Sequence, residues 1–374
     1  MQYTEYELGE LLPFEQPTAY IVKSTDYSDA YATPVLTAGK SFILGKTNET
    51  DGIFDQLPVI IFDDFTTATQ FVNFRFKVKS SAMKILHINT DLVIPKYIFY
   101  RLQIIQFDHS THKRYWIQSY SKIKVLIPSL DEQSRIVAHI EELFSELDKA
   151  VGTLKTTKEQ LEVYRQAVLV DAFRVATNST HLKIGYVCAK IVDCPHSTPK
   201  WEKNGKLCLR TTNFKRGYLD LQSPNYVSEE TFNDRNRRII PQPGDVLYSR
   251  EGSVLGIACT IPSNVYPCLG QRMMLLRSGE KLNNRYLMHY LNSPMVTNHV
   301  IATKGGTGSP HINVGDIKEF QIPIPSLEEQ SNIVRQIEEQ LSSCDNIEKT
   351  VDAILAQADA MRQSILKQAF EVTL

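Results

Sequence analysis

Two short Gly-Lys phrases near the start of the chain are the first residues whose types suggest nucleotide chemistry. AGKS ends at Ser41 and GKT ends at Thr47, and both match the last residues of the phosphate-binding P-loop pattern. A P-loop needs a glycine five residues before its second glycine, and those two positions hold Pro34 and Lys40. The sequence also lacks an Asn/Asp-Pro-Pro-aromatic tetrapeptide and a suitably spaced glycine-rich turn. We therefore expect no ATP or methyl-donor cofactor in this chain.

A metal site or a hydrolytic nucleophile would need spacings that differ from those in the chain. The candidate ligands are Cys188, Cys194, His196 and Cys208, but their C-x5-C-x-H spacing is not that of a zinc finger and lacks paired C-x2-C knuckles. Ser309 and His311 lie close together, but the G-x-S-x-G pattern of a nucleophile elbow is missing. We therefore expect reduced, buried cysteines, no metal site and no catalytic residue.

The chain does offer the side chains that DNA binding requires. Lys and Arg contact phosphates, whereas Arg, Asn, Gln, Ser and Thr contact base edges. In the second half these residues cluster in LRTTNFKRG, DRNRR, YSREGS, Gln271-Arg272 and KGGTGSPH, and in the first half in DDFTTATQ and HKRYW. The predicted DNA contacts are Thr66, Thr67, Lys77, Lys79, Lys84, His112, Lys113, Arg114, Arg210, Thr211, Asn213, Lys215, Arg216, Arg250, Arg272, Lys304, Ser309 and His311. Each residue alone also fits an ordinary solvated surface position, so the prediction depends on the clusters.

The formal net charge of −1 hides an uneven distribution of charge along the chain. Residues 176–322 hold 18 Lys and Arg against 11 Asp and Glu, a surplus of seven positive charges, and residues 1–126 are balanced. Residues 127–175 and 323–374 are acidic, with net charges of −3 and −5. If this is not chance scatter, a polyanion should meet 176–322 and avoid the two acidic segments.

The two acidic segments are copies of one another and must form the elements that position these clusters. IPSLDEQSRIV begins at Ile127 and IPSLEEQSNIV at Ile324, and the same offset aligns YRQAVLVDAF with MRQSILKQAF without a gap. Pro128, Ser129 and Glu132 form a helix start with a capping box, and the second copy repeats it. Each copy predicts one helix of about 44 residues, about 66 Å long.

Apolar residues in both copies recur alternately four and three residues apart, which is a heptad seam. The seam of the first copy is Ile136, Ile140, Leu143, Leu147, Ala150, Leu154, Leu161, Tyr164 and Val168. The seam of the second is Ile333, Ile337, Cys344, Ile347, Val351, Ile354, Ala358, Met361 and Ile365. We expect the helices to pair within one molecule, antiparallel rather than parallel; separate packing of each helix on its own domain is the alternative.

The segments that precede the two helices also echo each other. PKYIFYRLQ from Pro95 matches NRYLMHYLN from Asn284, and both segments contain apolar β-rich runs separated by Gly, Ser and Thr loops. The expected fold is α+β, a pseudo-two-fold tandem duplication of a β-rich mixed domain plus a long helix. The predicted boundaries are 1–126 and 176–322 for the domains and 127–175 and 323–374 for the helical regions.

This layout resembles the DNA-specificity subunit of a type I restriction-modification system over essentially the whole chain. In that family a Pro-x-x-x-Glu-Gln-x-x-Ile-Val phrase opens each conserved helix after a target-recognition domain. The residues that match are Pro128, Glu132, Gln133, Ile136 and Val137, and again Pro325, Glu329, Gln330, Ile333 and Val334.

The resemblance implies that each domain reads one half of a bipartite, asymmetric site in double-stranded DNA and that the antiparallel coiled coil sets the spacing. It also implies two modification subunits, which use S-adenosylmethionine to methylate adenine, and restriction subunits, which use ATP and magnesium to translocate and cleave. The chain itself would catalyse nothing.

Other readings remain open at this point. A self-sufficient restriction-methyltransferase would need roughly 200 further residues, so it is disfavoured. A coiled-coil scaffold with two protein-binding domains, and a specificity subunit of another phage-defence methylation system, are the alternatives. Because the sequence shows no signal peptide and no long apolar run, we expect a cytoplasmic protein without a membrane segment.

Overall fold

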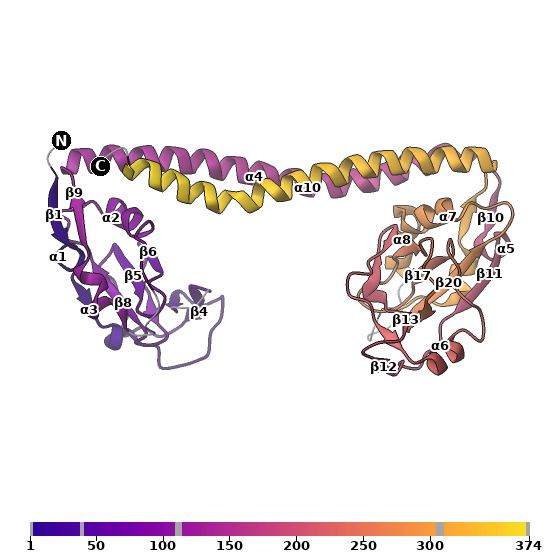
Figure 1. The fold of residues 1–374 in the computed structure, drawn as a ribbon, viewed down its shortest axis with the longest axis horizontal. Helices are drawn as coiled ribbons and strands as arrows, with labels where there is room; N and C mark the ends of the chain where they lie inside the picture. The colour runs from indigo at the N-terminus through magenta and orange to yellow at the C-terminus, as the bar shows by residue number, and fades with distance from the viewer. Residues whose placement is uncertain (1–2, 38–40, 109–113, 304–309, 372–374) are drawn as a thin grey trace. The chain divides into compact units, whose positions relative to one another are not determined.

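The computed structural model describes residues 3–37, 41–108, 114–303 and 310–371 and divides into two compact units (Figure 1). The first unit comprises Met1–Leu154 and Ala353–Leu374, and the second comprises Lys155–Asp352. Each unit combines one β-rich domain with a stretch of both long helices, so we call the two β-rich parts the first domain (residues 3–127) and the second domain (residues 179–323).

The first domain is built on a four-stranded antiparallel sheet with the strand order β2-β8-β5-β6. A three-stranded sheet, β4-β3-β7, includes the parallel pair β3 and β7, and β1 pairs with β9. The strands are β1 (Thr4–Glu7), β2 (Phe14–Glu15), β3 (Thr33–Leu36), β4 (Ile43–Thr47), β5 (Val59–Asp63), β6 (Thr69–Val72), β7 (Lys77–Val78), β8 (Met83–His87) and β9 (Lys124–Ile127). The helices are α1 (Leu8–Leu11), η1 (Pro17–Tyr20), α2 (Pro95–Leu102), α3 (Tyr115–Gln118) and η2 (Tyr120–Lys122).

The second domain repeats this plan and extends it. Its main sheet has the order β11-β20-β17-β18, a second sheet has the order β12-β16-β13-β19, and β10-β21 and β14-β15 form pairs. The strands are β10 (His181–Lys183), β11 (Cys188–Asp193), β12 (Trp201–Glu202), β13 (Lys206–Leu209), β14 (Phe214–Lys215), β15 (Tyr218–Leu219), β16 (Tyr226–Val227), β17 (Val246–Ser249), β18 (Ala258–Thr260), β19 (Cys268–Leu269), β20 (Met273–Ser278) and β21 (Gln321–Pro323). The helices are η3 (Ala176–Asn178), α5 (Ile184–Val187), η4 (Thr211–Asn213), α6 (Glu229–Arg235), α7 (Asn284–Asn292), α8 (Pro294–Thr303) and α9 (Val314–Glu319).

The two long helices are α4 (Leu130–Val175) and α10 (Leu327–Glu371), of 46 and 45 residues. In the second unit Lys158 contacts Asp352 at 2.7 Å and Arg165 contacts Asp345 at 2.6 Å. In that unit, residue numbers along α10 therefore fall as those along α4 rise. The structure confirms the predicted α+β fold with two β-rich domains and an antiparallel intramolecular helix pair.

The helix pair buries only part of the predicted heptad seam. Ile140 and Ile337 are fully buried, and Cys344 and Val351 are nearly so. In contrast, Tyr164, Ile347, Ile354 and Met361 remain between 42% and 50% exposed. In a two-helix pair each helix covers only the side of its partner that faces it, so one row of a wider apolar stripe stays in solvent.

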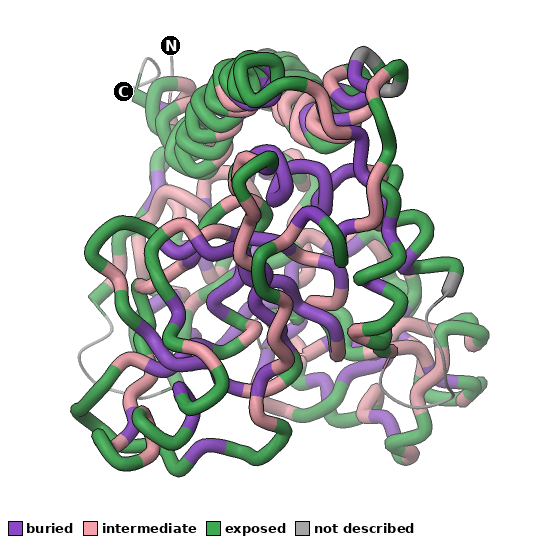
Figure 2. The backbone as a smooth tube through the Cα atoms, turned by 90° about the vertical axis from the view of Figure 1, so that its right-hand side faces the viewer, coloured by how far each residue is buried: buried purple, intermediate pink, exposed green. Residues whose placement is uncertain are grey.

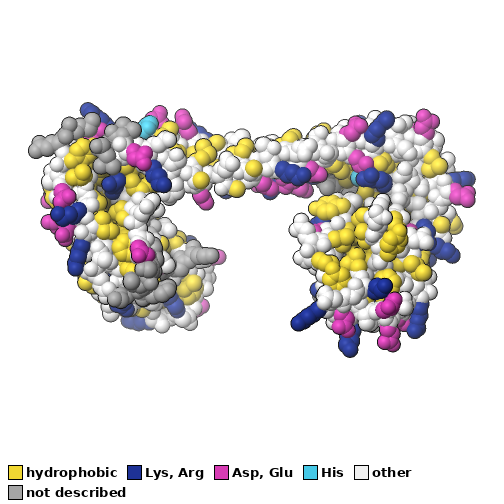
Figure 3. Space-filling view, viewed as in Figure 1, with side chains coloured by type: hydrophobic (Ala, Val, Ile, Leu, Met, Phe, Trp, Pro, Cys, Tyr) yellow, Lys and Arg dark blue, Asp and Glu magenta, His cyan; other side chains and the backbone are white. Residues whose placement is uncertain are grey.

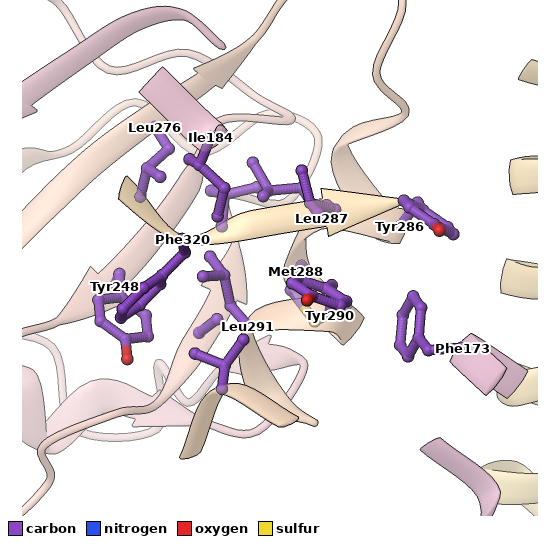
Figure 4. Close-up of a cluster of buried hydrophobic side chains, with 14 of the residues drawn as sticks. Phe173, Ile184, Tyr248, Leu276, Tyr286, Leu287, Met288, Tyr290, Leu291 and Phe320 are labelled. Atoms are coloured by element: carbon purple, nitrogen blue, oxygen red, sulfur yellow. The ribbon is translucent and has the colours of Figure 1, made fainter. Parts of the chain in front are cut away.

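Each domain is anchored to the long helices by aromatic packing at equivalent places of the repeat. In the first unit Phe370 of α10 packs against Tyr97 of α2, with 5.4 Å between the ring centroids. In the second, Phe173 of α4 packs against both Tyr286 and Tyr290 of α7 at 5.1 Å (Figure 4). The main cores therefore lie between each sheet and its short helix and continue onto the long helices, and the tube coloured by burial shows these interior stretches (Figure 2).

The repeated Glu-Gln phrase explains how the second domain is joined to the start of its helix. Gln330 is fully buried. Its amide oxygen accepts a hydrogen bond from the backbone N–H of Asn283 at 2.8 Å. Its amide nitrogen donates to the carbonyls of Lys281 and Pro325, both at 2.9 Å. One side chain thus satisfies three backbone groups at the junction of α7 and α10.

Gln133 makes the equivalent contacts in the first domain and is also fully buried. It accepts from the N–H of Ile94 at 2.8 Å and donates to the carbonyls of Leu92 and Pro128, both at 3.0 Å. The duplication therefore preserves a structural contact, and the phrase appears twice because two domains are each fixed to a helix start.

Candidate nucleic-acid interface

A concave pocket of about 210 Å³ on the second domain brings together side chains suited to nucleic acid. Its lining consists of Thr198, Pro199, Trp201, Arg210, Thr211, Gln271 and Arg272. We call this the Trp201 pocket. Three of the predicted contacts, Arg210, Thr211 and Arg272, lie in it.

One wall of the Trp201 pocket is formed by the ends of the short strands β12 and β13. The guanidinium carbon of Arg210 lies over the ring of Trp201, 5.4 Å from its centroid. The predicted contact Asn213 is buried, and its side chain accepts from the N–H of Arg210 at 2.8 Å and donates to the carbonyl of Asp220 at 3.0 Å. Asn213 therefore shapes the turn that carries Arg210, and we leave it out of the proposed contact surface.

A second wall is the connection between β19 and β20, and β19 pairs with β13 in parallel. The amide of Gln271 donates to the carbonyl of His196, and its oxygen accepts from the hydroxyl of Thr198 at 3.3 Å. Arg272 has a φ of +66°, in the left-handed region that non-glycine residues rarely adopt. Its side chain is 54% exposed and lies 3.7 Å from the carboxylate of Glu251.

Arg235, at the end of α6, fixes both walls from behind. Its buried guanidinium donates to the carbonyls of Leu269 at 2.6 Å and Gly270 at 2.9 Å, just before Gln271. It also donates to the carbonyls of Pro195 and Ser197, at 3.3 and 3.2 Å, just before Thr198. Within the described ranges no carboxylate lies within 4.0 Å of this guanidinium, so it places a buried positive charge behind the pocket.

Arg250, another predicted contact, is occupied by an ion pair. It is buried, and its guanidinium contacts the two carboxylate oxygens of Asp193 at 2.8 and 3.2 Å. This pair ties the end of β17 to the end of β11. Because a buried, bidentate pair is costly to break, we assign Arg250 to the frame of the domain.

The remaining predicted residues of the second domain lie in other surroundings. Lys215 and Arg216 line a separate depression of about 300 Å³, together with Tyr218 and residues of α4 and α10. His311 is exposed, and its backbone forms a β-bridge with Glu251, the partner of Arg272. Lys304 and Ser309 lie outside the described residues.

Two of the lysines predicted in the first domain belong to its interior. Lys77 is buried, donates to the carbonyl of Asp51 at 2.6 Å and contacts Glu49 at 3.1 Å. Lys84 is fully buried and forms an ion pair with Asp64 at 3.3 Å. Since neither ammonium group reaches the surface, the structure does not support phosphate contacts by Lys77 or Lys84.

Other predicted residues of the first domain do reach its surface. Thr66 and Thr67 lie at the β5-β6 turn, where the Thr66 hydroxyl donates to Asp63 at 2.7 Å and Thr67 has a φ of +58°. Lys79 is exposed and lies over the ring of Tyr27, 5.7 Å from its centroid. Arg114 is exposed, whereas His112 and Lys113 lie outside the described residues.

The predicted set omitted several pocket residues, Trp201 and Thr198 among them. The sequence signal for Trp201 was a tryptophan amid lysines in WEKNGK, but its cation–π partner Arg210 is nine residues away in sequence. Arg235 was part of the basic DRNRR cluster, and its burial could not be read from that cluster. The space-filling view shows Lys and Arg side chains on the surface of the second domain (Figure 3).

The cysteines and acidic groups form no metal site among the residues that the structure describes. There the cysteines are free thiols, and no three metal-ligating side chains gather into a site. Burial raises the pKa of Cys188 to about 12 and also raises the pKa of Cys259, which disfavours the reactive thiolate. No helix in the described parts of the chain has the length and apolarity needed to cross a membrane.

Comparison of the sequence with known proteins identifies one family of similar proteins. Residues 190–356 match the profile of the type I restriction modification DNA specificity domain. The chain is 32% identical to the specificity subunit of the Escherichia coli type I restriction enzyme EcoR124I/EcoR124II, over 95% of this chain and 90% of that protein. It is 26% identical to the EcoKI specificity subunit of Escherichia coli K12, over 67% of this chain and 58% of that protein.

Two solved structures have the same fold. The crystal structure of the HsdS subunit from Thermoanaerobacter tengcongensis superposes with a TM-score of 0.55 at 20% identity, covering 100% of this chain and 97% of that one. A chain from a study of complex assembly and conformational transition of the type I R-M system gives a TM-score of 0.68 at 19% identity, covering 98% and 97%.

Proposed function

Because the chain belongs to the DNA-specificity subunits of type I restriction-modification systems, we propose that its two domains each read one half of a bipartite, asymmetric site in double-stranded DNA. The observation that carries this proposal is the duplication of a whole unit. Both domains have a matching central sheet, and both are held to a helix start by an equivalent buried glutamine, Gln133 or Gln330. The loops beyond the shared frame differ, as expected of two domains that read different sequences.

We further propose that the chain directs chemistry performed by partner subunits. The expected partners are two modification subunits, which bring S-adenosylmethionine and methylate adenine, and restriction subunits, which bring ATP and magnesium for translocation and cleavage. The net negative charge of the helical segments disfavours DNA there and leaves their surfaces for protein contacts. Half-exposed apolar residues on α10, such as Ile354 and Met361, suit such contacts.

The length of the helix pair is proposed to set the number of base pairs between the two half-sites. Half-sites about one helical turn apart, roughly 34 Å between centres, present the same groove face to two equivalent domains. A rigid two-helix spacer would fix that separation, because neither helix contains a proline after its first turn.

The test is co-expression of this chain with its modification subunit, followed by genome-wide mapping of methylated adenine by single-molecule sequencing. A bipartite motif methylated on both strands is the expected result. Exchanging one domain for that of a related subunit should change one half of the motif and leave the other half intact.

Two other outcomes would contradict parts of the proposal. A stable complex that methylates no motif would indicate a different catalytic partner, as in another phage-defence system. Failure to form any complex, together with no salt-sensitive DNA binding, would favour a scaffold with two protein-binding domains.

A further inference from the structure

We infer that Arg272 reads a guanine through its major-groove edge, and that Arg210 and Trp201 hold the neighbouring DNA backbone. This inference rests on the proposed function and deepens it, because it assigns one base contact and one backbone contact to named side chains. The surface concerned is the Trp201 pocket, which lies wholly within the second domain.

The charge at the pocket favours an anionic ligand. Arg210 and Arg272 are both exposed, and Arg235 adds a third guanidinium buried behind them. Among the residues that the structure describes, Arg272 pairs with the carboxylate of Glu251, at the long distance of 3.7 Å. An exposed pair of this length is weak, so DNA can replace Glu251 at little cost.

The backbone of both pocket walls is held in place before any ligand binds. Arg235 bonds to four carbonyls that flank the two walls, and Gln271 bonds to His196 and Thr198 across the gap between them. Side chains that project from a fixed backbone lose less entropy on binding, which favours precise recognition.

The conformation of Arg272 indicates base reading rather than simple charge neutralisation. A phosphate contact needs only a positive charge, which any residue of an unstrained loop could supply. Arg272 instead has a left-handed backbone, which costs an arginine free energy and persists because its surroundings enforce it. Its planar fork of donors matches the O6 and N7 atoms of guanine, the commonest specific contact of arginine in the major groove.

Arg210 and Trp201 are better suited to the sugar-phosphate backbone. The guanidinium carbon of Arg210 lies 5.4 Å from the centroid of the Trp201 ring, a cation–π contact that leaves the N–H groups of Arg210 able to donate to a phosphate. Arg210 forms no ion pair within 4.0 Å among the described residues, and it follows β13, the parallel neighbour of the strand β19 that leads to Arg272. Such a residue contributes affinity that does not depend on sequence.

The experiment uses the complete methyltransferase, assembled from this chain and its modification subunit. Binding is measured by fluorescence anisotropy to duplexes that carry the mapped motif and to each single base-pair substitution in both half-sites. For Arg272→Ala we expect preference for one guanine to fall by about 5- to 150-fold while discrimination at the other positions stays unchanged. Arg272→Lys keeps the charge and should also lose this preference, so it carries the test if the alanine variant does not assemble.

Two further variants separate base reading from general electrostatics. Arg210→Ala should weaken binding equally to all duplexes and lower the slope of log affinity against log salt by about one. Arg285→Ala is the matched control, since Arg285 is an exposed arginine of the same domain paired with Glu338 at 2.7 Å, outside the pocket and outside the predicted DNA-binding clusters. It should leave every preference unchanged.

The outcomes distinguish this inference from the proposed function. If the wild-type complex selects a bipartite motif but Arg272→Ala and Arg272→Lys keep all preferences, or lose affinity equally at every position, base reading by Arg272 is refuted while the proposed function stands. A motif without guanine in the affected half-site would refute it equally. A wild-type complex that binds all duplexes equally would overturn both.

Discussion

Removing the buried amide of Gln330 should loosen the second domain from its helix. In Gln330→Ala the N–H of Asn283 and the carbonyls of Lys281 and Pro325 lose their partner in the same buried place. Each of the three hydrogen bonds contributes about 0.5–1.5 kcal/mol to stability, and an unpaired buried group carries a desolvation penalty. The expected total loss of stability is therefore about 3 kcal/mol. We expect a loss of that size in the free energy of local opening at this junction.

The assay is native-state hydrogen exchange of the peptide that contains Asn283. A loss of about 3 kcal/mol corresponds to amide exchange about 150-fold faster when opening is local. Gln336→Ala is the control, because Gln336 lies on the same helix but is exposed, and a substitution there should change stability by less than about 0.5 kcal/mol. Gln133→Ala should give an effect of the same size in the first domain.

The reasoning fails if Gln330→Ala exchanges no faster than Gln336→Ala. Unchanged protection of the Asn283 amide would mean that water or a rearranged loop replaces the glutamine at no cost. The buried contact would then not explain why the phrase is repeated.

Three other properties of the chain are directly testable. Lys84→Met should lower the free energy of unfolding of the first domain by about 3–5 kcal/mol in urea, because it leaves the Asp64 carboxylate buried without its partner, and an unchanged midpoint would contradict this. Hydrogen bonds from the Ser326 hydroxyl and N–H hold the pKa of Glu329 below its ordinary 4.5, so the stabilisation is present above pH 4.5 and is lost as pH falls through the lowered pKa. Ser326→Ala should raise that pKa toward 4.5 in an NMR titration, and no change would refute the capping role. Inserting four residues into both long helices adds about 6 Å to each, so the methylation map should show a spacer one or two base pairs longer with both half-sites unchanged.

The long helices could be predicted from sequence because their signals are local. The capping phrase at Ser129 and Ser326 and a seam repeated without a gap define where each helix begins and how far it runs. Pairing of the helices within one molecule followed from having two matching stripes in one chain. The seam itself was overestimated, since Ile347, Ile354 and Met361 fit the pattern but lie half exposed. Periodicity reports an apolar stripe and does not report how much of it the partner covers.

The candidate site was less predictable because contacts between distant segments decide it. Lys77 and Lys84 look like surface lysines in sequence, and only the fold brings Glu49 and Asp64 beside them. Arg235 belongs to a basic cluster but faces inward, toward carbonyls about 35 to 40 residues away. The clusters include Arg210 and Arg272, which the fold brings into one pocket, yet Trp201 joins them only through the pairing of β12 with β16 and of β16 with β13.

Strained backbone occurs in loops of both domains. Thr67 in the first domain and Arg272 in the second are non-glycine residues with φ near +60°, each in a connection at the end of a sheet strand. Glycine would relieve the strain at either place, by about 1 kcal/mol or more. A chain selected only for stability would be expected to hold glycine there, so the side chain must contribute something that glycine lacks. At Arg272 that contribution is the guanidinium in the Trp201 pocket. Arg272→Gly should therefore raise the melting temperature of the second domain while it abolishes the preference for guanine, whereas a fall in the melting temperature would show that the arginine supports the fold.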